Sequence, residues 1–244
     1  WSTHSSTIDG EDTRRCVVGA DNAMIDGFTI KRGNALDGGG MYNSSTGPTI
    51  KNCIVTENIA TATNWIGGTG GGGMYNVNCS PTVENCTFSG NSANYNGGGI
   101  YNNFVMTSPT VTYCFFIDNS ADNDGGGMYD RGYSTTVSNC VFSGNSSNSD
   151  GGGMYDQGYS TTMTNCLFFD NLADNGGGAY GIGLHSTLLN CTFWGNSASS
   201  GGGVYQVLAK NCIFWENNGG QIDGSSTVTF SCVQNVYPVT GNVS

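Results

Sequence analysis

The carboxylates are the side chains in this sequence best suited to catalysis, and their spacing bears on whether the chain is an enzyme. Hydrolysis of a glycosidic bond needs two carboxylates about 5–9.5 Å apart, and β-elimination of a uronate needs an Arg or Lys base beside an acidic Ca²⁺ site. The chain has no Asp-Asp pair, and Arg131 is the only Lys or Arg between Lys51 and Lys210. Its acids instead recur at equivalent positions of a repeat, as Asp130 and Asp156 do after a tyrosine. We therefore expect no catalytic residues and a protein that is not an enzyme.

One group of aspartates is dense enough to suggest a cation site. Carboxylates and loop carbonyls are the ligands that Ca²⁺ prefers. The alternative is that these residues are solvated loop acids, because Asp also precedes other glycine triplets of the chain. The sequence suggests no cofactor other than Ca²⁺. The candidate ligands are Asp118, Asp122, Asp124 and Asp150.

The cysteines recur in one position of the repeat, usually after an asparagine. In-register side chains of parallel strands point the same way and rarely reach the geometry of a disulfide, so we expect a column of small buried thiols. Disulfides are the alternative for an extracellular chain. Cys16 and Cys79 fall outside the column, and the absence of a Cys-x-x-Cys motif argues against a metal site. The expected column contains Cys53, Cys86, Cys114, Cys140, Cys166, Cys191, Cys212 and Cys232.

A tyrosine follows each Gly-Gly-Gly-aliphatic stretch. Alternation along a strand places the aliphatic residue and the tyrosine on opposite faces, and we expect the aliphatic residue to point inward. The tyrosines then form an outward column that could contact glycans or another solenoid. The alternative is that they stack only to stabilise the strands. The column contains Tyr42, Tyr75, Tyr101, Tyr129, Tyr155, Tyr180 and Tyr205.

One repeat positions all of these residues. The clearest copy of its second half is TVENCTFSGNSA, from Thr82 to Ala93, and the steps between the recurring cysteines are 33, 28, 26, 26, 25, 21 and 20 residues. Helical repeats keep nearly fixed lengths, whereas the coils of a β-solenoid tolerate loops of different lengths. The sequence therefore predicts an all-β fold: a single-stranded right-handed parallel β-helix of about nine coils.

We expect a single β-helix domain over residues 1–244. Residues 1–36 form partial N-terminal coils, 37–218 the regular coils, and 219–244 a C-terminal coil and tail. The Asn before the cysteine, as at Asn85, marks a corner, since Asn tolerates a left-handed backbone. A second Asn five residues after the cysteine is expected to stack in a hydrogen-bonded ladder. That ladder contains Asn58, Asn91, Asn119, Asn145, Asn171, Asn196 and Asn217.

The charge of the chain limits its partners. Eighteen acidic residues against seven basic ones give a formal net charge of −11, so the basic footprint of a nucleic-acid-binding protein is missing. No stretch approaches the roughly 20 apolar residues of a membrane-spanning helix. An acidic surface of this kind suits cations, neutral glycans or other proteins.

The paired motifs GGGMYN and NCTFSGNSA resemble the repeats of bacterial right-handed β-helix surface proteins and of polymorphic outer-membrane autotransporter passengers. The segment from Asn211 to Ser244 resembles the end of the choice-of-anchor group of secreted β-helix proteins. This resemblance implies an extracellular or cell-surface location. It says little about activity, because such proteins share the scaffold rather than a site.

Three functions remain open from the sequence. The first is a non-enzymatic structural or adhesive solenoid: a surface stalk, a passenger domain or a self-assembling fibre subunit. Self-association would be lateral or head-to-tail, since terminal coils without polar caps expose strand edges. The second is a carbohydrate-binding module that uses the tyrosine column. The third is a polysaccharide lyase or hydrolase.

Overall fold

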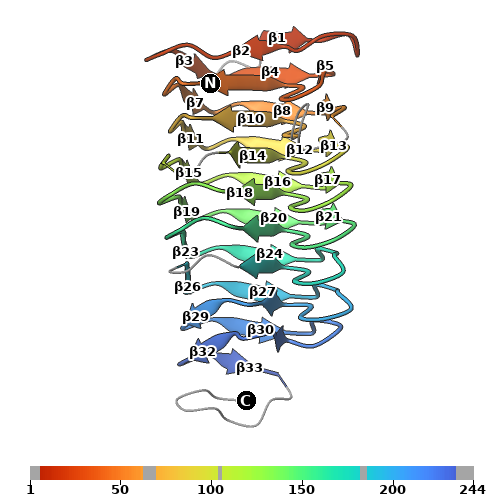
Figure 1. Ribbon diagram of the computed structural model, residues 1–244, viewed down its shortest axis with the longest axis vertical. Coiled ribbons are helices and arrows are strands. Elements are labelled where there is room, and N and C mark those ends of the chain that lie inside the picture. Colours follow the sequence, from red (N-terminus) through yellow and green to blue (C-terminus); the bar gives the residue numbers. More distant parts are fainter. Residues whose placement is uncertain (1–5, 63–69, 104–105, 182–185, 235–244) are drawn as a thin grey trace.

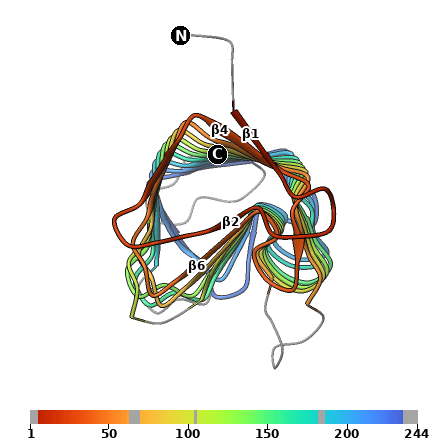
Figure 2. The same ribbon diagram turned by 90° about the horizontal axis from the view of Figure 1, so that it is seen from above.

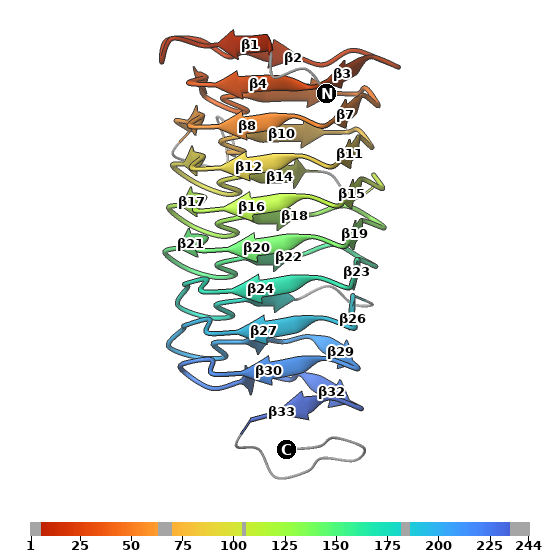
Figure 3. The ribbon, with the colours of Figure 1, turned by 180° about the vertical axis from the view of Figure 1, so that it is seen from behind.

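The computed structural model describes residues 6–62, 70–103, 106–181 and 186–234. Over these residues the chain winds into a right-handed parallel β-helix, as the sequence predicts, and every strand pairing is parallel (Figures 1 and 3). Seen from above, successive coils follow nearly the same outline (Figure 2). Each of the nine coils passes through three long sheets, which we name A, B and C, and several also pass through a short sheet D.

Sheets A and B form two of the long sides. Sheet A contains β1 (Ser6–Asp9), β4 (Phe28–Lys31), β8 (Ile54–Thr56), β12 (Thr87–Ser89), β16 (Phe115–Ile117), β20 (Val141–Ser143), β24 (Leu167–Phe169), β27 (Thr192–Trp194), β30 (Ile213–Trp215) and β33 (Cys232–Val233). Sheet B contains β2 (Val17–Val18), β6 (Met41–Ser44), β10 (Met74–Val77), β14 (Ile100–Asn103), β18 (Met128–Asp130), β22 (Met154–Asp156), β25 (Ala179–Gly181), β28 (Val204–Tyr205) and β31 (Ile222–Asp223).

Sheets C and D complete the coil. Sheet C contains β3 (Met24–Asp26), β7 (Thr49–Lys51), β11 (Thr82–Glu84), β15 (Thr110–Thr112), β19 (Thr136–Ser138), β23 (Thr162–Thr164), β26 (Thr187–Leu189), β29 (Leu208–Lys210) and β32 (Thr227–Thr229). Sheet D lies between A and B along the chain and contains β5 (Asn34–Ala35), β9 (Ile59–Ala60), β13 (Ser92–Ala93), β17 (Ser120–Ala121) and β21 (Ser146–Ser147).

The first circuit of the helix is complete within the residues expected to form only partial coils. β1, β2 and β3 each pair with a strand of the next coil. At the other end, β31, β32 and β33 continue the three sheets past residue 218. Residues 1–5 and 235–244, which the expected domain includes, lie outside the described residues.

The corners between sheets C and A follow from the recurring asparagines. Asn85 has φ +52° and its equivalents have φ between +51° and +55°, in the left-handed region that Asn tolerates better than most residues. Tyr113, the exception in the sequence pattern, adopts φ +56° at the same corner. The corner turns the chain so that Val83 and Phe88, on either side of it, both enter the core.

The interior is one continuous hydrophobic core. Six inward-facing phenylalanines of sheet A stack along the axis with ring centroids 4.6–5.2 Å apart, and each is fully buried: Phe88, Phe116, Phe142, Phe168, Phe193 and Phe214. The aliphatic residues before the tyrosines, such as Met74 and Ile100, pack against them. Burial of each such side chain contributes about 1.5–3 kcal/mol.

The glycine triplet is required by close backbone contacts between and within coils. Gly97 has φ +67°, and a Cβ there would lie 2.8 Å from the Cβ of Tyr101. A Cβ on Gly98 would lie 2.4 Å from the carbonyl oxygens of Gly126 and Ser120 in the next coil. A larger residue would therefore push the coils apart at this turn.

Candidate functional site

The seven tyrosines form one column along sheet B, on the face opposite the main core. Neighbouring rings lie 4.6–5.6 Å apart. The four from Tyr75 to Tyr155 form a separate buried cluster and are at most 8% exposed. Tyr42, Tyr180 and Tyr205 are half-buried. The four middle rings therefore do not form the outward contact column that the sequence predicts.

The side chains two residues after the tyrosines contact the rings. Asn103 Nδ2 donates a hydrogen bond to the hydroxyl of Tyr75 at 2.6 Å. The hydroxyl of Tyr129 donates to Gln157 Oε1 at 3.0 Å. The sequence carries this signal, because alternation places the residue two positions after each tyrosine on the same face as the tyrosine.

Arg131 also belongs to this covering layer. Its guanidinium interacts with Tyr101, Tyr129 and Tyr155. Burial raises the pKa of Tyr129 and of Tyr155, so both remain neutral phenols. The one cation in the middle of the sequence is therefore hydrogen-bonded to a tyrosine of the column.

The four aspartates considered as Ca²⁺ ligands do not converge. Asp118 lies at the corner between sheets A and D and occupies the space that a Cβ on Gly144 would need. Asp122 is exposed in the following turn. Asp124 and Asp150 lie in adjacent coils, where the backbone N–H of Asp150 donates to Asp124 Oδ1 at 3.3 Å.

These placements do not bring the four aspartates together as one Ca²⁺ site. Among the described residues, no three His, Cys, Asp or Glu side chains form a group that could hold a metal ion. The physical reason is the path of the coil, which carries Asp118 and Asp124 to different turns although they are close in sequence. Burial raises the pKa of both Asp124 and Asp150.

The cysteine column follows the corners between sheets C and A. Seven of its eight expected members, from Cys53 to Cys212, are buried, and all ten cysteines of the chain are free thiols. The backbone N–H of Cys86 donates to Cys114 Sγ at 3.5 Å, and the thiol of Cys86 donates to the carbonyl of Glu84 at 3.3 Å. Outside the column, burial raises the pKa of Cys79 to about 11. These thiols act as small core residues.

The placement of Cys232 in this column is wrong. Cys232 pairs with Ile213, one position after the cysteine of the preceding coil. Ser231 takes the column position, where its Oγ accepts a hydrogen bond from the N–H of Cys212 at 3.0 Å. The interior position belongs to Val233, and strand alternation from this residue gives the correct register.

The asparagine ladder turns the corner from sheet A toward sheet D. Its seven members are at most 8% exposed. Asn145 is typical: its Nδ2 donates to Asn171 Oδ1 and to the carbonyl of Phe116, both at 2.9 Å. Its Oδ1 accepts from the N–H and Nδ2 of Asn119 at 3.1 and 2.9 Å. Each buried amide thus forms hydrogen bonds with the coils on both sides of it.

A second polar ladder on the core-facing side of sheet B was missed from the sequence. Asn43 donates to Asn76 at 2.7 Å and Asn76 to Asn102 at 2.8 Å. Asn102 donates to Asp130 Oδ1 at 2.8 Å. The available signal was that the residue after most tyrosines is Asn or Asp.

This second ladder ends in a buried pair of carboxylates. Asp130 and Asp156 are both 0% exposed. Thr161 Oγ1 lies 3.2 Å from Asp130 Oδ2 and 2.9 Å from Asp156 Oδ1. Because a hydroxyl has one hydrogen, Thr161 can donate to only one of these carboxylates at a time.

The surroundings of the pair favour retention of a proton. Burial raises the pKa of Asp130, and burial together with the neighbouring Asp130 carboxylate raises the pKa of Asp156 to about 7. Asp156 Oδ2 has no hydrogen-bond partner. Asp156 also lines a cavity of about 10 Å³ beside Gly181, which replaces the acid in the next coil. A proton on one carboxylate lowers the cost of burying two charges.

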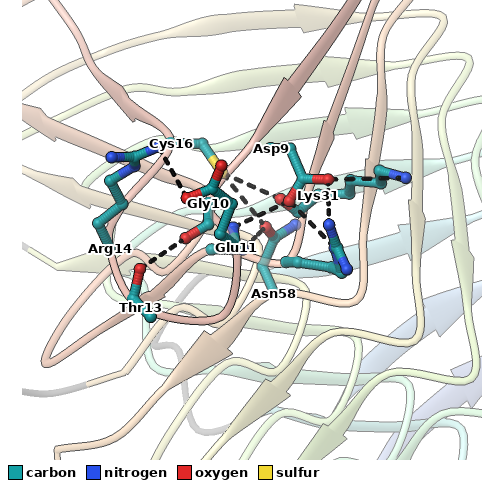
Figure 4. A network of polar contacts seen from close by, with 10 residues as sticks. Asp9, Gly10, Glu11, Thr13, Arg14, Cys16, Lys31 and Asn58 are labelled. Carbon is teal, nitrogen blue, oxygen red and sulfur yellow. Dashed lines mark hydrogen bonds and ion pairs between the residues drawn. The ribbon is translucent and has the colours of Figure 1, made fainter.

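Charged side chains at the N-terminal end belong to a scaffold network (Figure 4). Arg32 donates two hydrogen bonds to the carboxylate of Asp9, which lowers the pKa of Asp9. The thiol of Cys16 donates to the carbonyl of Lys31 at 3.2 Å. Asn58, the first residue of the asparagine ladder, accepts a hydrogen bond at its Oδ1 from the backbone N–H of Gly33 in the preceding coil. These contacts join the first coils to each other.

The outer face of sheet A carries exposed apolar residues that the sequence pattern did not single out. Ile54 and Phe115 are 44% and 46% exposed in its N-terminal half. Trp194 and Trp215 are 44% and 40% exposed on adjacent strands in its C-terminal half, with Ile213 at 46% beside them. Large exposed apolar groups that cluster on one face often mark a contact surface.

Comparison with known proteins gives one match. Residues 85–103 match the model of the Chlamydia polymorphic membrane protein (Chlamydia_PMP) repeat. This stretch runs from a corner asparagine through β12, the ladder and a glycine triplet into β14. No curated protein and no solved structure matches the chain. Within the described residues, no helix is long and apolar enough to cross a membrane.

Proposed function

We propose that this chain is a non-enzymatic structural or adhesive segment of a β-solenoid displayed on a cell surface. Two findings support the proposal. The first is the all-parallel solenoid, whose core and ladders run continuously from coil to coil. The second is the likeness of residues 85–103 to a repeat of a membrane protein family.

The non-enzymatic part of the proposal depends on one observation: the side chains that could do chemistry are buried inside the solenoid. A catalytic pair of carboxylates must reach the substrate, yet Asp130 and Asp156 are fully buried. Arg131, the cation nearest them in sequence, is hydrogen-bonded to Tyr101 of the tyrosine column. The cysteines of the column from Cys53 to Cys212 are buried as well. The surface is therefore the part of the molecule that is available for function.

A turnover assay tests this proposal against the lyase or hydrolase alternative. Purified protein is incubated with neutral and uronate-containing polysaccharides, and reducing ends and unsaturated uronates are measured. We expect no product above a heat-denatured control. Product release by the wild-type protein that disappears in the Asp130→Asn variant would contradict the proposal, because it would assign catalysis to the buried pair.

The burial of its middle rings weakens the hypothesis that the tyrosine column binds glycans. The rings from Tyr75 to Tyr155 are buried. A bound sugar could reach only the half-buried tyrosines near the two ends of the column. Self-association, lateral or head-to-tail, stays a prediction from the sequence.

A further inference from the structure

The C-terminal half of sheet A presents aromatic side chains to solvent on adjacent strands. Phe169, Trp194 and Trp215 occupy equivalent positions of β24, β27 and β30, which lie one below another along the solenoid (Figure 1). The ring centroids of Phe169 and Trp194 are 6.4 Å apart, with their planes tilted by 37°. We name these three residues the aromatic strip. It runs along the axis, across the strands.

The strip is partly pre-organised. Trp194 Nε1 donates a hydrogen bond to Glu216 Oε2 at 2.9 Å, which restrains the indole on the surface. Phe169 is half-buried beside it. A rigid aromatic face loses little entropy when a ligand stacks on it.

Carboxylates border the strip at the corner of the coil. Asp170 and Glu216 follow Phe169 and Trp215 directly, and both are exposed. β24, β27 and β30 contain no Lys or Arg. Carboxylates accept hydrogen bonds and offer none when ionised. The border therefore favours a ligand rich in hydroxyl donors and disfavours an anionic one.

Charge also argues against a second copy of this chain as the occupant. Face-to-face packing of two identical strips would bring their acidic borders close together. Like charges across an interface oppose association, and the chain already has a formal net charge of −11. A neutral ligand avoids this repulsion.

We propose that the aromatic strip binds neutral oligosaccharides. The polarised C–H groups of the sugar rings pack on the electron-rich faces of the indoles, and the sugar hydroxyls donate hydrogen bonds to Asp170 and Glu216. The inference rests on the proposed function, because it names the class of partner through which the surface would adhere.

The test is a titration of the whole chain with defined sugars. Cellohexaose, xylohexaose, laminarihexaose and mannohexaose are the neutral probes, and hexagalacturonate is the anionic one. Binding is followed by tryptophan fluorescence. The Trp194→Ala/Trp215→Ala variant serves as a blank, because its remaining fluorescence comes from Trp1 and Trp65 alone. We expect at least one neutral sugar to bind and hexagalacturonate not to bind.

Matched variants locate the site. Trp194→Ala/Trp215→Ala should weaken binding by at least about tenfold when measured by calorimetry, while Trp194→Phe/Trp215→Phe retains part of it. Phe230→Ala removes another exposed aromatic, outside the strip, and should leave affinity unchanged. All variants should keep the wild-type melting temperature, since the altered side chains lie on the surface.

Two results would overturn the inference. One is the absence of binding by every neutral sugar at about 10 mM, a concentration at which even very weak ligands occupy a site. The other is binding that survives loss of both indoles. If the protein adheres to cells but fails this titration, the proposed function stands and the sugar assignment falls.

Discussion

At the scale of single residues, the buried asparagines show how an amide stabilises this solenoid. Asn145 donates to Asn171 and Phe116 and accepts from Asn119, so its side chain joins neighbouring coils. A buried polar group that loses its partner costs about 1–3 kcal/mol. One substitution in the ladder leaves several such groups without partners.

We predict that Asn145→Leu lowers the free energy of unfolding by about 3–5 kcal/mol, because it removes the acceptor of the N–H and Nδ2 of Asn119 and the side-chain donor to Asn171 Oδ1 and the carbonyl of Phe116. Urea denaturation measures the change. The control is Asn165→Ala at an exposed corner, where the link to Asn139 is 3.3 Å long. We expect at most about 1 kcal/mol there. Equal losses in the two variants would contradict a special role for the buried ladder.

The sequence predicted the structural positions of these residues correctly where the residue type and the spacing of the repeat agreed. Corner asparagines such as Asn85 adopt the expected left-handed backbone. Cys232 departs from the predicted column because alternation around the inward-facing Val233, and not residue type, sets the register of the last coil. A small polar residue at the column position, Ser231, is equally compatible with the core because its hydroxyl finds a backbone partner.

At the scale of elements, the two faces of sheet B carry different sets of side chains, and the sequence revealed them only in part. The core-facing side carries the second polar ladder, which ends at Asp130 and Asp156, and the opposite face carries the tyrosines. Alternation predicted which way each side chain points. It could not predict the burial of Tyr101 and Tyr129, because burial depends on side chains and turns from other positions and neighbouring coils.

The acidic pair should make stability depend on pH in an unusual direction. The pKa of Asp156 in the folded state is about 7, above the 3.8 of an unperturbed Asp. Between these values the folded state binds more protons than the unfolded state, so its stability falls as pH rises. The contribution is fully present below about pH 4 and is lost as pH passes through about 7.

We predict that Asp130→Asn weakens this dependence and stabilises the protein at pH 8, by on the order of 2–4 kcal/mol. Asn already occupies the equivalent positions 43, 76 and 102, so the amide suits the ladder. Unfolding free energies are compared at pH 5 and pH 8 in both proteins. The wild-type-minus-variant difference cancels the effect of Asp9, whose pKa is lowered by Arg32. A difference that does not change with pH would contradict the raised pKa of the Asp130–Asp156 pair.

At the scale of the whole molecule, the fold was predictable because a single repeat sets its period, corners and core. Identical residue types stack in register over many coils, as Phe88, Phe116 and Phe142 do. The outer surface does not obey the repeat so strictly, and the aromatic strip occupies positions that hold Thr or Ser in other coils, such as Thr56 and Ser89. The candidate contact face could therefore be found only once the strands were placed.

Adhesion of beads that display the whole chain to glycan-bearing cells tests the central claim most directly, namely that this solenoid acts through its surface. Wild-type beads and beads carrying the interior variant Asp130→Asn should adhere equally. Trp194→Ala/Trp215→Ala beads should adhere less if the aromatic strip is the contact. Wild-type protein that is folded by circular dichroism yet adheres no better than albumin-coated beads would contradict the account.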